Sequence, residues 1–345
     1  MRFEGVRIEA LAHVLPEDVV PSEALEERLA PVYERLRLRV GRLELMTGIR
    51  ERRFFPPGTR PSDAAARAGE AALGAASPDF DRGRVGCLVH AAVCRDFLEP
   101  ATASVVHRAL SLPSECLVFD LSNACLGVAN GMAVVGGMIE RGEIEAGLVV
   151  AGENGRALVD QTIADALANE ALDRETFKAA FASLTIGAGA AAMLLTRADG
   201  REDRRLLGGA VRADSSHLEL CQGDADGMAG PLMSTDSEAL LHAGNALAAR
   251  TFEAFLAELS WSRDDIQRVV THQVGVAHRR LLLETLELDP ERDFPTVETL
   301  GNVGSVSLPL SLSMAVEAGH VAPGHEVALL GIGSGLHCMM LGVRW

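Results

Sequence analysis

The feature that most constrains the fold is a repeated order of apolar strands and amphipathic helices. Hydrophobic periodicity predicts, in the first half of the chain, a strand at 2–14, a helix at 63–76, a strand at 85–93, a helix from about residue 101, the strand CLVFDL, the helix LGVANGMAVVGGMIERG and the strands AGLVVAG and GAGAAAMLLTR. The second half repeats this order with the strand RLLGGAVRA, a helix at 238–259, the strand IQRVVTH, a helix at 276–287, a short strand at 293–298, a helix at 304–319 and the strands EVALLGIG and HCMMLGVRW. The repetition predicts a duplicated, layered α/β architecture.

The repeat divides the 345 residues into two predicted halves, 1–198 and 199–345. Two segments of the first half fall outside the repeated pattern. Residues 15–60 are expected to form an amphipathic helix and a loop, and residues 155–186 interrupt the last two strands of that half. Because insertions often cap or line a pocket, we expect both near a binding site, with 155–186 as either a tunnel wall or an ordinary helical cap.

The composition fits this architecture and excludes several classes of protein. Hydrophobic residues make up 48% of the chain and aromatic residues only 4%, so the core is expected to consist mainly of Ala, Val, Leu and Gly. The net charge of -16 argues against a general nucleic-acid surface, although a local basic patch for one small anion stays open. No apolar run approaches the roughly 18 residues of a membrane span, and we expect a cytoplasmic protein without a membrane span or signal peptide.

The cysteine pattern argues against a disulfide framework or a metal site. Six cysteines without CxxC spacing predict free thiols. His90 and Cys94 do not suit a metal pair, because four residues along a strand span about 13 Å. The GIGSG turn lies between the last two strands and opens no helix, which argues against a dinucleotide fingerprint. We expect no metal.

Four polar residues follow predicted strands, where open α/β sheets gather their functional groups. They are Glu99, Cys125, His272 and Asn302, and the repeat makes Cys125 equivalent to Asn302 and the Glu99 loop equivalent to the His272 loop. The start of a helix is expected to lower the pKa of the Cys125 thiol toward about 7. Each residue also has a structural alternative: a core cysteine, a hydrogen-bonded histidine, an N-cap asparagine, or a solvated glutamate.

At these residues the sequence resembles the thiolase superfamily and, within it, the ketoacyl synthase III group. The Cys-His-Asn set of that group matches Cys125, the THQ segment at His272 and the GNVGS segment at Asn302, and TGIRERRF and GIGSGL resemble two further motifs. The resemblance covers essentially the whole chain and implies a thiolase-like duplicated five-layer α-β-α-β-α fold. It also implies an oxyanion hole formed by the backbone N–H groups of Cys125 and Ser334.

A narrower resemblance concerns the segments CRDFLEPATAS, SNACLG, HQV and LLGIGSGL, which together look like the head-to-head acyl-CoA condensing enzymes of bacterial long-chain olefin biosynthesis. It implies that Cys125 carries an acyl group, that His272 and Asn302 hold a second acyl-CoA, and that Glu99 removes its α-proton from across a homodimer interface. The implied reaction is a non-decarboxylative Claisen condensation of two medium- to long-chain acyl-CoA molecules to a 2-alkyl-3-ketoacyl product. Acyl-CoA is then a substrate, no cofactor is needed, and downstream olefin-pathway enzymes are expected partners.

Two other functions stay open at this point. A decarboxylative 3-oxoacyl-[acyl-carrier-protein] synthase III would use malonyl thioester, whose loss of carbon dioxide supplies the carbanion without a base such as Glu99. A non-catalytic thiolase-fold subunit would bind acyl chains only. The CoA contacts are also open, because Met46 stands where many ketoacyl synthases III have an arginine, and Arg50, Arg52 and Arg53 are candidates by charge alone.

Overall fold

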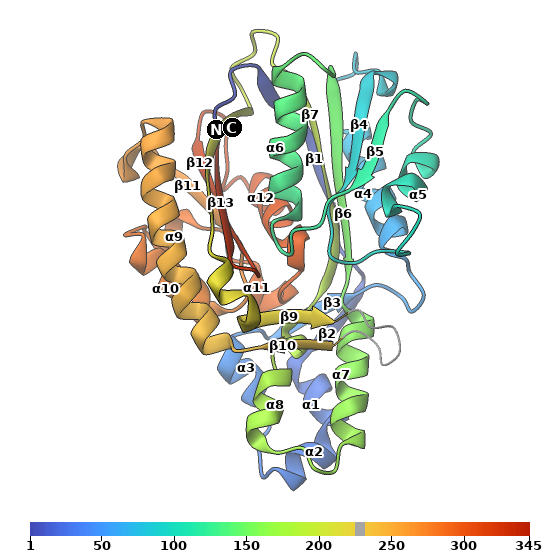
Figure 1. The fold of residues 1–345 in the computed structure, drawn as a ribbon, viewed down its shortest axis with the longest axis vertical. Coiled ribbons are helices and arrows are strands. Elements are labelled where there is room, and N and C mark those ends of the chain that lie inside the picture. Colours follow the sequence, from blue (N-terminus) through green and yellow to red (C-terminus); the bar gives the residue numbers. More distant parts are fainter. Residues whose placement is uncertain (225–231) are drawn as a thin grey trace.

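The computed structural model describes residues 1–224 and 232–345, through which a mixed nine-stranded sheet runs (Figure 1). The strand order is β11-β12-β13-β8-β1-β7-β6-β4-β5. The strands are β1 (Val6–Val14), β4 (Val85–His90), β5 (Leu117–Asp120), β6 (Ala146–Asn154), β7 (Ala188–Arg197), β8 (Arg205–Ala213), β11 (Arg268–Thr271), β12 (Glu326–Gly333) and β13 (His337–Arg344). A single residue pair, Arg7 with Arg205, joins β1 to β8, so the sheet consists of two halves that meet at their first strands.

Helices cover both outer faces of the two sheet halves and fill the space between them. Helices α4 and α5 pack on the first half, α9 and α10 lie on the second, and α6 and α12 lie between (Figure 1). Their bounds are α4 (Pro61–Gly74), α5 (Thr102–Ala109), α6 (Gly127–Glu140), α9 (Ser237–Leu259), α10 (Val276–Thr285) and α12 (Ser307–Glu317). This arrangement is the five-layer α-β-α-β-α order expected from the sequence.

Three apolar layers hold these elements together, and alternate residues of each strand belong to different layers. In β4, Val89 packs in the central layer with α6 and α12, whereas Leu88 packs in the outer layer with α4. In β12, Leu329 packs in the central layer and Leu330 packs with α9 and α10. These two strands are therefore apolar on both faces, which explains their continuous hydrophobic runs in the sequence.

The strand order supports an internal duplication. The first half has the order β1-β7-β6-β4-β5 and the second has β8-β13-β12-β11, which is the same order with the last position missing. The strand predicted at 293–298 belonged at that position, and this prediction is wrong. Asp293 makes only an isolated bridge to Val269, and Val297–Leu300 forms helix α11. Pro295 has no N–H group for a ladder hydrogen bond, and this limits pairing there. The boundary at 198/199 stays a prediction.

The two insertions form a cap at one end of the molecule (Figure 1). Residues 15–60 were expected to hold one amphipathic helix and a loop, and this expectation is wrong. They form a two-stranded antiparallel sheet and three short helices: β2 (Asp18–Pro21), β3 (Glu51–Phe54), α1 (Ser22–Arg28), α2 (Ala30–Arg35) and α3 (Arg42–Thr47). Gly41 and Gly48 flank α3 with positive φ angles, which end a helix readily.

The second insertion packs directly on the first. It contains α7 (Arg156–Ala168) and α8 (Arg174–Ala180). Arg28 pairs with Asp160 at 2.8 Å, and the Arg174 side chain donates to the carbonyl oxygen of Leu36 at 2.8 Å. Both insertions therefore act as one structural unit beside the sheet.

One further two-stranded antiparallel sheet was not predicted. It is formed by β9 (Cys221–Asp224) and β10 (Leu232–Thr235) and lies next to the cap (Figure 1). Across the two described ranges, no helix combines the length and the apolarity that crossing a bilayer requires.

The close packing at the start of α6 is testable. A Cβ on Gly127 would lie 2.4 Å from the carbonyl oxygen of Ala91 and 3.4 Å from the Cβ of Ser305. We expect Gly127→Ala to lower the free energy of unfolding by about 1–3 kcal/mol, as overpacking in a core does. Gly74→Ala in α4 is the control, because a Cβ there meets no atom within 4 Å and alanine favours helix. Urea unfolding compares the two, and equal stability would contradict the close contact.

Candidate active site

A cavity of about 90 Å³ lies beyond the carboxyl ends of β11 and β12, beside the turn that precedes α6. Its walls come from α9, α10 and the loops after these two strands. The polar lining residues are Cys125, Asn245, His272, His278 and Ser334, and most of the others are aliphatic. Three predicted site residues, Cys125, His272 and Ser334, are thus brought together from segments far apart in the sequence.

Cys125 lies in a tight turn two residues before α6. The backbone N–H of Leu126 donates to the Asn123 carbonyl oxygen, and Ala124 has a positive φ angle, so the turn presents the thiol at the edge of the sheet. Burial, with smaller contributions from the Glu153 carboxylate and Cys221, raises the pKa of the Cys125 thiol to about 12. The expected lowering toward 7 is therefore wrong, because loss of water outweighs the helix start.

His272 follows β11, and its side chain is 5% exposed. Within the described residues, neither ring nitrogen has a hydrogen-bond partner. This contradicts the structural alternative of a satisfied core histidine. Burial, with a smaller effect of His278, lowers the pKa of His272 to about 4, so the ring is neutral near pH 7. Leaving a buried polar group unpaired costs about 1–3 kcal/mol, which makes this imidazole a prepared site for a ligand atom.

Asn302 is not among the residues that line the cavity. Backbone hydrogen bonds to the segment before β7 hold it in place. Its N–H donates to the carbonyl oxygen of Thr185 and its own carbonyl accepts from Gly187, both at 2.9 Å. Its side-chain oxygen accepts from the N–H of Gly304 at 3.0 Å. The asparagine therefore stabilises a turn rather than capping α12, and its amide nitrogen is the atom left to donate to a substrate.

Ser334 lies at the turn between β12 and β13, directly against the cysteine. A Cβ on the neighbouring Gly333 would lie 3.4 Å from the backbone nitrogen of Cys125. The Ser334 hydroxyl donates to the sulfur of Cys221 at 3.3 Å. The residue before Ser334 thus packs against the backbone of Cys125, and the pairing of the two N–H groups as oxyanion donors stays a prediction.

Glu99 is not part of this cavity. It lies in the exposed loop after β4, together with the exposed apolar side chains of Val93, Phe97 and Leu98. The expectation that Glu99 shares a crevice with His272 is not met within one chain.

Three polar residues near the cavity were missed by sequence reasoning. Asn245 of α9 and His278 of α10 line it, and Glu153 lies at the carboxyl end of β6. The strand-end rule that selected Cys125 applies equally to Glu153 and could have found it. Asn245 and His278 lie inside helices, where no sequence signal distinguishes them from surface polar residues.

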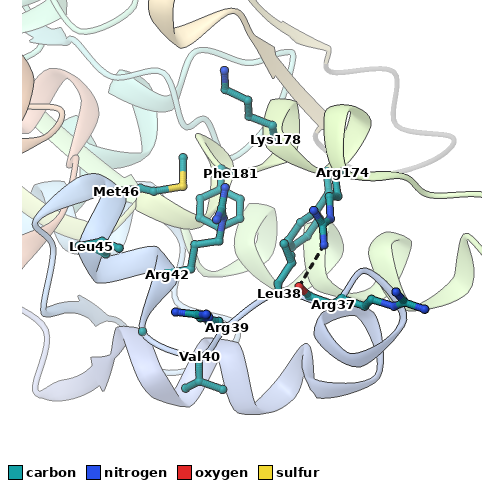
Figure 2. Close-up of a pocket in the computed structure, with 12 residues that line it drawn as sticks. Arg37, Leu38, Arg39, Val40, Arg42, Leu45, Met46, Arg174, Lys178 and Phe181 are labelled. Carbon is teal, nitrogen blue, oxygen red and sulfur yellow. Dashed lines mark hydrogen bonds between the residues drawn. The ribbon is translucent and has the colours of Figure 1, made fainter.

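A second, larger cavity of about 500 Å³ lies in the cap between the 37–46 segment and α8. Figure 2 shows that Arg39 and Arg42 line it from the first segment, whereas Arg174 of α8 donates to the carbonyl oxygen of Arg37 at 3.1 Å and Lys178 of α8 points away from the two arginines. Leu38, Met46 and Phe181 supply apolar walls, and Arg37 adds a fifth cation. In a chain with a net charge of -16, this is a local concentration of positive charge suited to an anion.

The two cavities are neighbours. The last residues of α3 touch the loop that follows His272: a Cβ on Gly48 would meet the Val276 side chain at 2.3 Å, and one on Gly275 would lie 3.3 Å from the carbonyl oxygen of Thr47. Met46 faces the cationic cavity on one side of this contact, and Val274 lines the cysteine cavity on the other.

The three arginines proposed from charge alone have other contacts. Arg52 is fully buried and donates to Ser22 and to the carbonyl oxygen of Leu184, and burial lowers its pKa to about 10. Arg50 pairs with Glu298 at 3.0 Å. Arg53 donates to the carbonyl oxygen of Pro16. None of them lines either cavity.

Family comparisons agree with this geometry. The family described as 3-Oxoacyl-[acyl-carrier-protein (ACP)] synthase III matches residues 119–215, and its C-terminal counterpart matches residues 256–345. An acyl-CoA:acyl-CoA alkyltransferase of Shewanella oneidensis is 41% identical, with 100% of both chains covered. The enzyme of that name from Xanthomonas campestris pv. campestris is 37% identical, again with 100% of both covered. A beta-ketoacyl-[acyl-carrier-protein] synthase III of Dinoroseobacter shibae is 29% identical, with 98% of both covered.

Solved structures confirm the fold class. A crystal structure of a cysteine-to-alanine variant of Xanthomonas campestris OleA superimposes with a TM-score of 0.94 at 36% identity, covering 100% of this chain and 98% of the other. The cerulenin-bound form of OleA gives the same values. The duplicated five-layer fold and the resemblance to this family are thus confirmed, and the chain belongs to the acyl-CoA:acyl-CoA alkyltransferase family of thiolase-fold enzymes.

Proposed function

We propose that this protein joins two medium- to long-chain acyl-CoA molecules head to head, without decarboxylation, to give a 2-alkyl-3-ketoacyl product. The observation that carries the proposal is one cavity lined by the half-buried Cys125, by the Ser334 turn and by a neutral imidazole that has no partner in the described chain. Full-length alkyltransferase relatives support the same function. These groups suit acyl transfer through a covalent cysteine intermediate.

In the first step, Cys125 attacks the thioester carbonyl of one acyl-CoA. Because the thiol pKa of about 12 lies far above the pKa of about 4 of His272, a separated thiolate–imidazolium pair is disfavoured. The proton therefore leaves sulfur toward His272 as the new C–S bond forms. The backbone N–H groups of Cys125 and Ser334 stabilise the oxyanion, and the departing CoA thiolate takes the proton.

In the second step, Glu99 takes the α-proton of another acyl-CoA. The thioester oxygen of the resulting enolate accepts hydrogen bonds from His272 and from the Asn302 amide nitrogen. The enolate carbon attacks the acyl-cysteine carbonyl, the bond to sulfur breaks, and the sulfur regains a proton. Hydrolysis of the remaining thioester then gives the 2-alkyl-3-ketoacid, the substrate expected for an enzyme later in the pathway.

A homodimer accounts for the position of Glu99. In its own chain Glu99 is exposed and outside the cavity, next to the exposed apolar side chains of Val93, Phe97 and Leu98. Strand β5 beside this loop is an edge strand, with unpaired backbone groups on one side. An apolar surface at a free sheet edge favours association, and we propose that it carries Glu99 into the site of the second subunit.

The acyl chains are proposed to lie along α9 and α10. Leu240, Leu241 and Leu282 line the cysteine cavity from these helices, and each buried methylene contributes about 0.8 kcal/mol. The 155–186 insertion, considered as a tunnel wall, contributes no residue to this cavity among the described parts of the chain. Its α8 lines the cationic cavity instead.

The cationic cavity is proposed to hold the phosphate groups of CoA. Its cations compensate for Met46, which replaces an arginine of many ketoacyl synthases III, and the contact between α3 and the His272 loop makes it a neighbour of the thiol. Arginine and lysine side chains suit phosphate oxygens. An acyl-CoA would then reach from this cavity to Cys125 with its pantetheine arm.

The central test is incubation of the purified protein with a long-chain acyl-CoA alone. We expect CoA release together with a 2-alkyl-3-ketoacid or its ketone, detected by mass spectrometry. Cys125→Ala should abolish both signals, because the acyl-enzyme cannot form. Product that requires malonyl thioester would instead establish the decarboxylative alternative, and binding without turnover would establish the non-catalytic one.

Subunit mixing tests the role of Glu99. Glu99→Ala should still acylate Cys125 but lose condensation, and Cys125→Ala should lose both. A mixed dimer of the two variants contains one complete site only if Glu99 acts across the interface, so it should regain about half of the wild-type activity. Glu143→Ala, an exposed carboxylate change away from the site, is the control with unchanged activity. Mixed dimers without activity would contradict the shared site.

Substitutions in the cationic cavity test the CoA contact. Arg39→Ala and Arg42→Ala should each raise KM for acyl-CoA about tenfold with little change in kcat, since a charge-assisted hydrogen bond is worth about 1.5–3 kcal/mol. Turnover of the matching S-acyl pantetheine, which lacks the nucleotide, should be unaffected by either change. Arg50→Ala, which removes a cation outside the cavity, is the matched control. Equal losses with both substrates would contradict phosphate binding.

A further inference from the structure

One buried carboxylate connects the loops that carry the predicted catalytic residues. Glu153 lies at the carboxyl end of β6 and is 5% exposed. Its oxygens accept four hydrogen bonds: from the N–H of Val93 at 2.9 Å, the N–H of Cys94 at 3.0 Å, the N–H of Ser305 at 3.2 Å and the hydroxyl of Ser305 at 2.7 Å.

These donors belong to two different loops. Val93 and Cys94 begin the loop after β4, which continues to Glu99. Ser305 follows Gly304, whose N–H donates to the side chain of Asn302. Hydrogen bonds to Glu153, together with the peptide bond between Gly304 and Ser305, therefore connect the Glu99 loop with the Asn302 turn.

The packing around Glu153 leaves little freedom for either loop. A Cβ on Gly304 would lie 3.0 Å from a Glu153 carboxylate oxygen, and one on Gly127 would touch both the carbonyl of Ala91 and Ser305. Gly304 also has a positive φ angle of 55°, which favours glycine. The turn that holds Asn302 is thus pressed against the carboxylate and against the helix that follows Cys125.

The Glu153 charge also acts on the thiol. After burial, repulsion by Glu153 is the next cause that raises the pKa of Cys125, followed by Cys221. Burial and the same carboxylate raise the pKa of Cys94 as well. A negative charge beside a nucleophilic thiol opposes thiolate formation, so Glu153 does not activate Cys125, and its contribution lies in the hydrogen bonds that it accepts.

We propose that Glu153 is a positioning residue for the condensation step. It holds the Glu99 loop and the Asn302 turn in fixed positions relative to Cys125. A carboxylate suits this role because both oxygens accept only, and all four contacts come from donors. The inference rests on the proposed function for its kinetic readout, whereas its second readout, the reactivity of Cys125, does not depend on any substrate.

The kinetic test compares Glu153→Gln, Glu153→Asp and Ser305→Ala. Glutamine keeps the length of the side chain but replaces one acceptor by a donor. Aspartate keeps the charge, but its shorter side chain cannot reach the donors of both loops. Ser305→Ala removes only the 2.7 Å hydrogen bond from the Ser305 hydroxyl. Each should lower the rate of condensation at least tenfold while acylation of Cys125 by acyl-CoA, measured in a single turnover by protein mass, changes less than threefold. Glu140→Gln, which alters a carboxylate that accepts from the N–H groups of Glu4 and Gly5 at the far end of α6, is the control.

The substrate-free test is alkylation of Cys125 by iodoacetamide across pH 6–10, with the modified peptide identified by mass spectrometry. Glu153→Gln removes the charge and should speed alkylation at pH 8, because repulsion by this carboxylate raises the pKa of the Cys125 thiol. Glu153→Asp and Ser305→Ala retain the charge and should react at the wild-type rate, which separates the charge from a simple opening of the site.

Two results would overturn the proposal. One is condensation within twofold of wild type in all three variants. The other is an equal loss of acylation and condensation, which indicates a general structural role. Failure of the wild-type protein to condense acyl-CoA would instead refute the proposed function, and the alkylation result would still decide whether Glu153 acts on Cys125.

Discussion

The structure depends on one apolar layer that two sheet halves share. Helices α6 and α12 are buried between the halves, so the inner faces of both halves must lie against the same pair of helices. Because parallel strands in each half end toward the same edge, the turn before α6 and the loop after β11 converge there. Cys125 and His272, 147 residues apart in the sequence, line one cavity for this reason.

Exclusion of water governs the chemistry of that cavity. Burial raises the pKa of the Cys125 thiol, lowers the pKa of the His272 imidazole and leaves both imidazole nitrogens without partners in the described chain. Both groups are therefore neutral when the site is empty. Neutral groups suit a long apolar acyl chain, and proton transfers then accompany bond formation instead of preceding it. The cationic side chains lie apart from these groups, in the cap cavity.

Most strands and helices of the core could be predicted from the sequence, because apolar runs and helical periodicity are local sequence patterns. Buried strands such as Ala188–Arg197 read as continuous apolar runs, and the helix Ser237–Leu259 was predicted within one residue. The strand expected at 293–298 failed because the proline there prevents continued pairing. The prediction for residues 15–60 was wrong because its three helices, of six or seven residues each, are too short to produce a periodicity signal. Contacts with the second insertion hold this segment in place.

The sequence by itself determined the duplicated α/β architecture and predicted the cysteine, histidine and asparagine as site residues, since strand order and motifs depend on local sequence. Only the tertiary structure decided the rest. The protonation state of Cys125 depends on how far the packed layers exclude water from the thiol. Glu99 is exposed because its loop lies beside β5, the edge strand of the sheet. The cationic cavity and the Glu153 contacts join residues from separate segments. Such properties depend on residues that are close in space but distant in the sequence, so no local sequence pattern predicts them.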